Sequence, residues 1–301
     1  NQHSAAGQTT LWADGEQFRA IRASAPDIIE GGQFERTAAM IDISDRDSYV
    51  VDIFRVVGGT DHAKFTHSHF GQITVQGLSH QPAEDYGHET QMRNFQCDPS
   101  PQPGWSVDWK IEDRYQLAPP GSDLHLRCTD LTRDAQAYLC EGWVSLGGYR
   151  GVEEEWIPRL MVRRQTQRRP LASTFVSVLE PYETKSNIAR IRRLPLQAPS
   201  GTAYPDSYVA LEIELLDGRR DLFVAADVER PLGPGRSVHD EPIILQNDWG
   251  LRLDGELCWL RLNKAGKIEH LALCYAKALS LGDLSFSADP TGDLTELTFP
   301  P

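Results

Sequence analysis

The chain has 301 residues, of which 40% are hydrophobic, and a formal net charge of −13. This is enough apolar material for a substantial core, but no apolar run is long enough to cross a membrane. A strongly acidic chain is also a poor partner for nucleic acid, whose phosphates need a basic surface. We therefore expect neither a membrane nor a nucleic acid as partner.

The first two thirds of the chain contain long apolar segments with the composition of strands. Residues 34–43, 49–57 and 171–179 are apolar on both faces for part of their length, which is typical of central strands covered on both sides. Residues 82–120 are rich in proline and predict a long ordered loop with one short strand at 105–111.

The last third of the chain alternates between apolar and polar residues. Residues 208–216 have the period of two that is typical of a half-exposed antiparallel strand. Asp217-Gly218 then predicts a hairpin turn into 221–226. The same pattern predicts turns at Asp254-Gly255 and at Lys264-Ala-Gly266, with the strands 251–253, 257–262 and 268–275 around them.

Helical periodicity is poor throughout, so these elements predict an all-β fold. We expect a large antiparallel β-sandwich of stacked sheets with few or no helices. Residues 1–196 form the main sandwich in this prediction. Residues 197–301 form a hairpin-rich remainder that we assign to the same sandwich, because 197–205 reads equally well as a long loop.

The five cysteines do not form a recognisable framework. Their number is odd and no Cys-x-x-Cys occurs, which disfavours a disulfide scaffold or a zinc ribbon. One disulfide among the five is an open alternative.

Two basic clusters stand out in this acidic chain. They comprise Arg163, Arg164, Arg168 and Arg169 in the first, and Lys185, Arg190, Arg192 and Arg193 in the second. Such runs usually face water, and we favour that interpretation. The alternative is docking to a negatively charged polymer or an acidic partner domain.

Histidines are concentrated in one part of the chain. Five of the nine lie at positions 62, 67, 69, 80 and 88. If one strand covers His67 and His69, their side chains share a face, where they could ligate zinc, transfer protons or bind an anionic substrate. They could equally be ordinary polar residues of an exposed sheet. Two histidines are too few for a metal site, so we assign no metal ligands.

One segment resembles a known family. "DSYVVDIFRVVGGTDH" is similar to the β-sheet region of the heparinase II/III-like polysaccharide lyases, a group that includes alginate lyases. The stretches "FRAIRASAPDIIEGGQFERT", "GWSVDWKIED" and "STFVSVLEPYETKSNIARIRRL" resemble further segments of that family in the same order. The matched positions are Tyr49, Val50, Asp52, Phe54, Arg55, Val56, Gly58, Gly59, His62, His69 and Gly71.

This resemblance implies the β portion of a two-part enzyme. In the family, an N-terminal α/α-toroid packs on the β-sandwich, and the polysaccharide binds between them. The toroid is missing from this sequence. The family's structural zinc would be held by ligands upstream of Asn1, so we expect no cofactor in this chain. The resemblance also implies a periplasmic or secreted protein, although the first residues do not look like a signal peptide.

The expected chemistry assigns roles to side chains. Lyases of this kind abstract a proton beside a uronate carboxylate, which must be neutralised, and protonate the departing oxygen. Our candidates for the catalytic side of the cleft are His67, His69, Tyr86 and His88. The candidates for substrate binding are His62, Gln91, Arg93, Trp105 and Trp109, where the tryptophans would stack on sugar rings or pack in the core.

We therefore expect a β-sandwich that lines the substrate cleft of a lyase acting on a uronic-acid-containing polysaccharide by β-elimination. The isolated chain should have little or no lyase activity, because the toroid is absent. One alternative is a non-catalytic carbohydrate-binding or scaffold module. A weaker alternative is a zinc-dependent hydrolase that uses His67 and His69.

Overall fold

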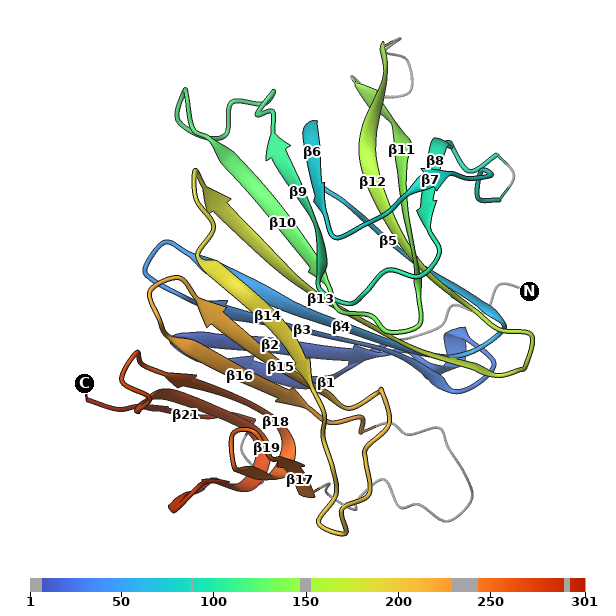
Figure 1. Cartoon of the computed structure of the whole chain (residues 1–301). Helices are drawn as coiled ribbons and strands as arrows, with labels where there is room; N and C mark the ends of the chain where they lie inside the picture. The colour runs from blue at the N-terminus through green and yellow to red at the C-terminus, as the bar shows by residue number, and fades with distance from the viewer. Residues whose placement is uncertain (1–6, 88, 147–152, 229–242, 290–292, 301) are drawn as a thin grey trace. The chain divides into compact units, whose positions relative to one another are not determined.

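The computed structural model describes residues 7–87, 89–146, 153–228, 243–289 and 293–300. These residues form twenty-one strands, and every sheet pairing described is antiparallel. One short 3-10 helix, η1 (Pro26–Ile28), is the only helix of the described part. The prediction of an all-β chain built from large antiparallel sheets is confirmed (Figure 1).

The chain divides into two compact units. Unit 1 comprises residues 1–58, 172–174 and 187–301, and unit 2 comprises 59–171 and 175–186. This division differs from the predicted boundary at residue 196, because the C-terminal third folds with the N-terminal strands.

Unit 1 contains two layers of strands. The first layer has the order β1 (Gln8–Asp14), β2 (Phe18–Ser24), β3 (Gln33–Asp42) and β4 (Ser48–Gly58). The second layer is ordered β14 (Ile188–Leu194), β15 (Val209–Leu215), β16 (Arg220–Ala225), β18 (Leu251–Leu262), β19 (Ile268–Leu281) and β20 (Leu284–Ser287). In addition, β17 (Ile243–Gln246) pairs with β18, and β21 (Thr295–Thr298) pairs with β19.

The two layers of unit 1 face each other across an interior that contains buried charges. Arg261 and Asp221 are fully buried and form a bidentate pair with both N–O distances at 2.7 Å. Tyr49 of β4 donates a hydrogen bond of 2.5 Å to the same carboxylate from the opposite layer. Arg55 of β4 forms a single contact of 2.5 Å with the buried Glu35, whose other carboxylate oxygen has no hydrogen-bond partner among the described residues. Apolar side chains surround these pairs, so each charge is removed from water together with its partner.

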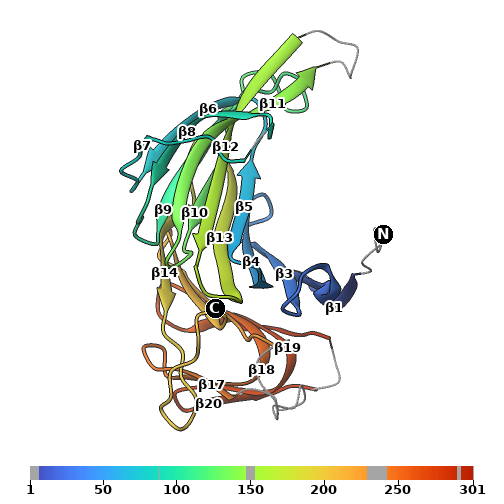
Figure 2. The same cartoon turned by 90° about the vertical axis from the view of Figure 1, so that its right-hand side faces the viewer.

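Unit 2 also contains two layers. One is ordered β13 (Leu171–Glu183), β10 (Leu124–Asp130), β9 (Trp105–Ile111) and β6 (Gly71–Gln76). The other is a five-stranded sheet ordered β5 (Asp61–His67), β12 (Glu153–Gln165), β11 (Gln136–Leu146), β8 (Met92–Asp98) and β7 (Gln81–Pro82). Figure 2 shows β11 and β12 running side by side.

The five-stranded sheet has an inner face and an outer face. On the inner face Lys64 of β5 donates a hydrogen bond of 2.9 Å to Ser177 of β13, in the other layer. Trp109 of β9 contacts the carbonyl oxygen of Pro158 in the same interior. Because side chains alternate along a strand, Phe65, His67 and Arg163 point to the outer face. Ala83, Tyr86 and Met92 pack on this face and partly cover it.

Two predicted elements differ from the structure. The predicted turn at Asp254-Gly255 lies inside the continuous strand β18, where only a register shift occurs. Gly255 is needed there because a Cβ would lie 2.4 Å from the Cβ of Ala276 on β19. The predicted loop at 82–120 contains β8 as well as the expected strand β9.

The turn at Asp217-Gly218 is confirmed, with Gly218 at φ +92°. All five cysteines are free thiols. Among the described residues no helix has the length and apolar character needed to cross a membrane.

Candidate functional site

The histidine pair expected on one strand face is divided by the end of β5. His67 is the last residue of β5 and is exposed, whereas His69 lies in the bend that follows. His69 Nδ1 accepts a hydrogen bond of 2.8 Å from the backbone N–H of Phe70, and its ring makes an edge contact with Tyr115 at 5.0 Å. The shared-face argument for His67 and His69 therefore does not hold.

Three of the predicted substrate-binding residues lie in the interior. His62 is 7% exposed, Trp105 is 2% exposed and Trp109 is fully buried. Stacking on a sugar requires an accessible ring face, so the expectation that either tryptophan stacks on substrate is corrected, and both are core residues. The predicted catalytic residue His88 lies outside the described residues.

Gln91 and Arg93 flank the start of β8. Gln91 is exposed, has a φ of +55°, and accepts a hydrogen bond at its carbonyl oxygen from the N–H of Trp143. Arg93 Nε donates to Glu141 at 2.8 Å, and its guanidinium carbon lies 4.0 Å from the ring centre of Trp156. The charge of Arg93 is thus already paired.

Tyr86 lies at a cavity on the outer face of the five-stranded sheet. Its half-buried ring lies 4.8 Å from the guanidinium carbon of Arg163 and 5.8 Å from the ring of Phe65. The cavity has a volume of about 630 Å³. Its lining residues are Asp61, Ala83, Glu84, Asp85, Tyr86, Gly87, Tyr138 and Arg163.

The arginine of this cavity is compensated by a carboxylate. Arg163 Nε and Nη2 donate to the two oxygens of Asp61 at 2.9 Å and 2.5 Å. This bidentate contact holds the pKa of Asp61 below its usual value. Burial raises the pKa of Tyr138, and a hydrogen bond with Cys97 adds to the effect. The cavity therefore contains the Arg163–Asp61 ion pair, the phenols of Tyr86 and Tyr138, and the further carboxylates of Glu84 and Asp85.

Arg159 supplies a positive charge on the same outer face. It is the residue opposite His67 in the pairing of β12 with β5. Its guanidinium lies over Gly142 of β11, where a Cβ would be 2.8 Å from the arginine Cζ. Arg159 Nε is buried without a hydrogen-bond partner, and no carboxylate among the described residues forms an ion pair with this side chain. Arg159 was not among the residues predicted from the sequence.

A second polar network lies on the layer that contains β9, β10 and β13. The carboxylate of Asp108 accepts hydrogen bonds from Arg127 Nε at 3.2 Å and from the hydroxyl of Tyr182, and its Oδ1 lies 2.6 Å from His125 Nδ1. The rings of His125 and Tyr182 stack at 4.8 Å. Burial, followed by the hydrogen bond to Asp108, raises the pKa of Tyr182 to about 12.

This network was missed, although the sequence contains a signal for it. Residues 105–111 alternate strictly, which places Ser106, Asp108 and Lys110 on one face and the tryptophans on the other. Every described polar group of the network already has a partner within it, so we assign it a structural role in joining three strands.

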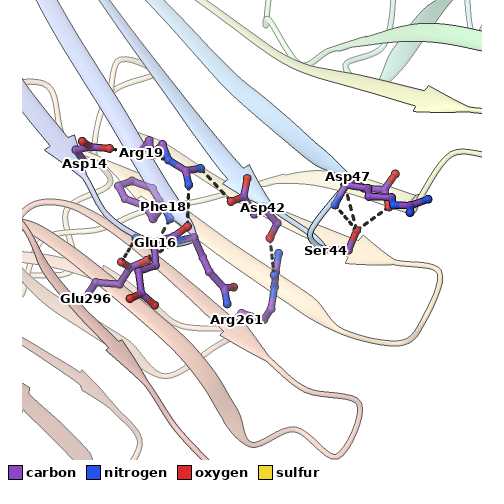
Figure 3. Close-up of polar contacts among 11 residues, drawn as sticks. Asp14, Glu16, Phe18, Arg19, Asp42, Ser44, Asp47, Arg261 and Glu296 are labelled. Carbon is purple, nitrogen blue, oxygen red and sulfur yellow. Dashed lines mark hydrogen bonds and ion pairs between the residues drawn. The ribbon is translucent and has the colours of Figure 1, made fainter. Parts of the chain in front are cut away.

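A third group of polar contacts lies in unit 1 (Figure 3). These contacts lie beside a cavity of about 500 Å³, and residues 42–48 form part of its lining. The carboxylate of Glu296 accepts hydrogen bonds from three successive backbone N–H groups, those of Glu16, Gln17 and Phe18, at 2.6 to 3.1 Å. Arg19 donates to Asp42 at 2.9 Å. These contacts hold the β1–β2 turn and satisfy backbone donors that would otherwise be unpaired.

No group of three or more histidine, cysteine, aspartate or glutamate side chains is arranged to hold a metal ion in the ranges that the structure describes. The outer face of the five-stranded sheet, with Arg159, His67 and Tyr86, is therefore the best candidate site. It combines an arginine without an ion-pair partner in the described part of the chain, an exposed imidazole, and a phenol beside a cavity.

Comparison with known proteins gives little further guidance. No protein-family model and no curated protein matches the chain. Among solved structures, a heparan sulfate lyase HepC mutant from Pedobacter heparinus is similar with a TM-score of 0.38 and 14% sequence identity. The match covers 76% of this chain but only 28% of that protein. Similarity at this level carries no argument about function.

Proposed function

We propose that unit 2 binds a uronic-acid-containing polysaccharide on the outer face of its five-stranded sheet. The observation that carries the proposal is Arg159, a partly buried arginine without a carboxylate partner among the described residues, next to the exposed His67. Removing part of a guanidinium from water without a counter-charge is costly. A ligand carboxylate would supply the missing counter-charge through a charge-assisted hydrogen bond.

The neighbouring residues suit the rest of a uronate unit. His67 can hydrogen-bond a carboxylate or hydroxyl at the exposed end of β5. Tyr86 offers a half-buried ring and a phenol at the cavity, and amphipathic rings of this kind suit sugars, which have apolar faces and polar edges. Arg163 adds no net charge because Asp61 neutralises it.

The resemblance of residues 47–62 to the heparinase II/III-like lyases supports a lyase-related role for this binding face. In that role the chain lines the substrate cleft, and an α/α-toroid contributes the groups that complete β-elimination. We therefore expect binding without turnover from this chain alone.

A binding experiment tests the proposal. Alginate, heparan sulfate and hyaluronan oligosaccharides are titrated into the wild-type chain and into Arg159→Ala and His67→Ala. A hydrogen bond to a charged group contributes about 1.5–3 kcal/mol, so Arg159→Ala should weaken binding about tenfold or more. The matched controls are Arg190→Ala and His80→Ala, which remove exposed side chains elsewhere.

The outcomes separate the alternatives. Equal binding by the wild type and Arg159→Ala would reject the proposed site. Formation of unsaturated uronate products by the chain alone would reject the expectation that it is inactive. Binding of the polysaccharide by a complete protein that lacks a toroid would instead favour the non-catalytic module.

A further inference from the structure

Several arginines of unit 2 lie on one strand and the turn after it. Arg159 and Arg163 lie on the outer face of β12, since they are four residues apart in a strand where alternate side chains share a face. Beyond the end of β12 at Gln165, Arg168 and Arg169 lie in the turn that leads to β13.

Not all of these charges are available to a ligand. Asp61 neutralises Arg163 with two short contacts. Arg164 Nε donates to the backbone oxygen of Asp134 at 3.3 Å, which links β12 to the segment between β10 and β11. By contrast, Arg168 and Arg169 are exposed, and no carboxylate within the described ranges forms an ion pair with them.

Within the described residues, arginines without a carboxylate partner therefore occur at two places, one on β12 and one in the turn beyond its end. From Arg159 to the end of β12 at Gln165 there are six residues, and a strand rises by about 3.3 Å per residue, so this stretch of β12 alone is about 20 Å long. Tyr86, which lies over Arg163, is between the two places, and its cavity also contains the carboxylates of Asp61, Glu84 and Asp85. A single sugar unit is far too short to reach both.

We propose that the ligand is a polyanionic chain that runs along β12 from Arg159 to the Arg168–Arg169 turn, so that the site favours long uronate chains over short ones. The inference rests on the proposed function, because it takes Arg159 as one end of the binding track. Two linked contacts raise affinity through effective concentration, provided that the ligand can span them. A disaccharide held at Arg159 gains nothing from the turn.

The experiment measures the dependence of affinity on chain length. A uronate disaccharide and an oligosaccharide longer than the track are titrated into the wild type, Arg168→Ala/Arg169→Ala and the control Arg46→Ala/Arg190→Ala. The control removes two exposed arginines of unit 1 and the same total charge. Since all four side chains are on the surface, circular dichroism and thermal midpoints should be unchanged.

A long oligosaccharide offers more disaccharide units to the Arg159 site, which alone raises its apparent affinity in proportion to their number. In the wild type, the long oligosaccharide should bind at least about tenfold more tightly than this proportional gain. Arg168→Ala/Arg169→Ala should lose this excess and keep its affinity for the disaccharide, whereas the control keeps both. Affinity of the double variant for the long chain should also depend less on salt, because fewer charges are paired.

Retention of the full excess by Arg168→Ala/Arg169→Ala would overturn the inference while leaving the proposed function intact. If the disaccharide binds too weakly to measure, the long oligosaccharide alone tests the inference. Equal affinity of the wild type and Arg168→Ala/Arg169→Ala for this oligosaccharide would overturn it. A different result would reject the proposed function, namely unaltered binding of the polysaccharide by Arg159→Ala.

Discussion

Arg159 and Gly142 occupy opposite strands of one hairpin, and the guanidinium of the arginine lies in the space that a glycine side chain leaves empty. A Cβ at position 142 would be 2.8 Å from the arginine Cζ. Gly142 therefore makes room for the cation on the outer face of the sheet. This relationship connects a backbone position on β11 to the charge that we assign to ligand binding.

Replacing Gly142 by alanine should impair binding without unfolding the protein. The added methyl group meets the flexible end of an arginine rather than backbone, so the guanidinium should move and the sheet should persist. We expect several-fold weaker binding of a uronate oligosaccharide and a thermal midpoint close to that of the wild type. Unchanged affinity would show that the position of the guanidinium over Gly142 does not matter.

The buried Arg261–Asp221 pair should dominate the stability of unit 1. Asp221→Ala removes the carboxylate that Arg261 and Tyr49 share and leaves a buried guanidinium uncompensated. Breaking such a pair costs about 3–5 kcal/mol, and urea unfolding measures the loss. Asp221→Leu/Arg261→Met should recover part of this loss, since it removes both charges. A loss below about 1 kcal/mol for Asp221→Ala would contradict this interpretation.

His270 should make unit 1 less stable in mild acid. Burial, together with the nearby charge of Arg261, lowers the pKa of this imidazole below 6.5. The unfolded chain therefore binds the proton more readily, and stability that is present above pH 6.5 is lost as the pH falls towards the folded-state pKa. The urea midpoint should fall between pH 7.5 and pH 5.5 by more in the wild type than in His270→Gln. Identical pH dependence of the two proteins would refute the assignment.

Tyr182 should remain protonated to unusually high pH. Burial and the contact with Asp108 place its pKa at about 12, compared with about 10 for an ordinary tyrosine. Ultraviolet difference titration of the wild type against Tyr182→Phe isolates its phenolate. Asp108→Asn should lower the pKa of Tyr182, because it removes the negative charge that opposes ionisation. Ionisation near pH 10 in the wild type would contradict the network described here.

The sequence predicts eight of the twenty-one strands, some from apolar runs and others from alternation with a period of two. Residues 34–43 and 49–57, for example, appear in the structure as β3 and β4 within one residue at either end. Asp254-Gly255 misleads because glycine serves two purposes. At Gly218 it permits a positive φ in a turn, whereas at Gly255 it allows β19 to approach closely, and only the register distinguishes them.

The candidate site was predictable only in part. Tyr86 and His67 were identified from the clustering of histidines and the loop composition. The residues that surround Arg159 are determined by the register of β12 with β5 and β11. No local sequence pattern reveals this register. His67 and His69 could not be separated from the sequence, since a strand that ends one residue earlier or later looks the same. The burial of Trp105 and Trp109 follows from the alternation of residues 105–111, which faces both rings inward.

The central claim is that Arg159 holds the carboxylate of an anionic polysaccharide on the outer face of the five-stranded sheet. Calorimetric titration of one uronate oligosaccharide into the wild type, Arg159→Ala and Arg190→Ala, at a single fixed salt concentration, tests it most directly. We predict about tenfold or greater weakening for Arg159→Ala alone. Equal affinities for all three proteins, each folded, would contradict the claim.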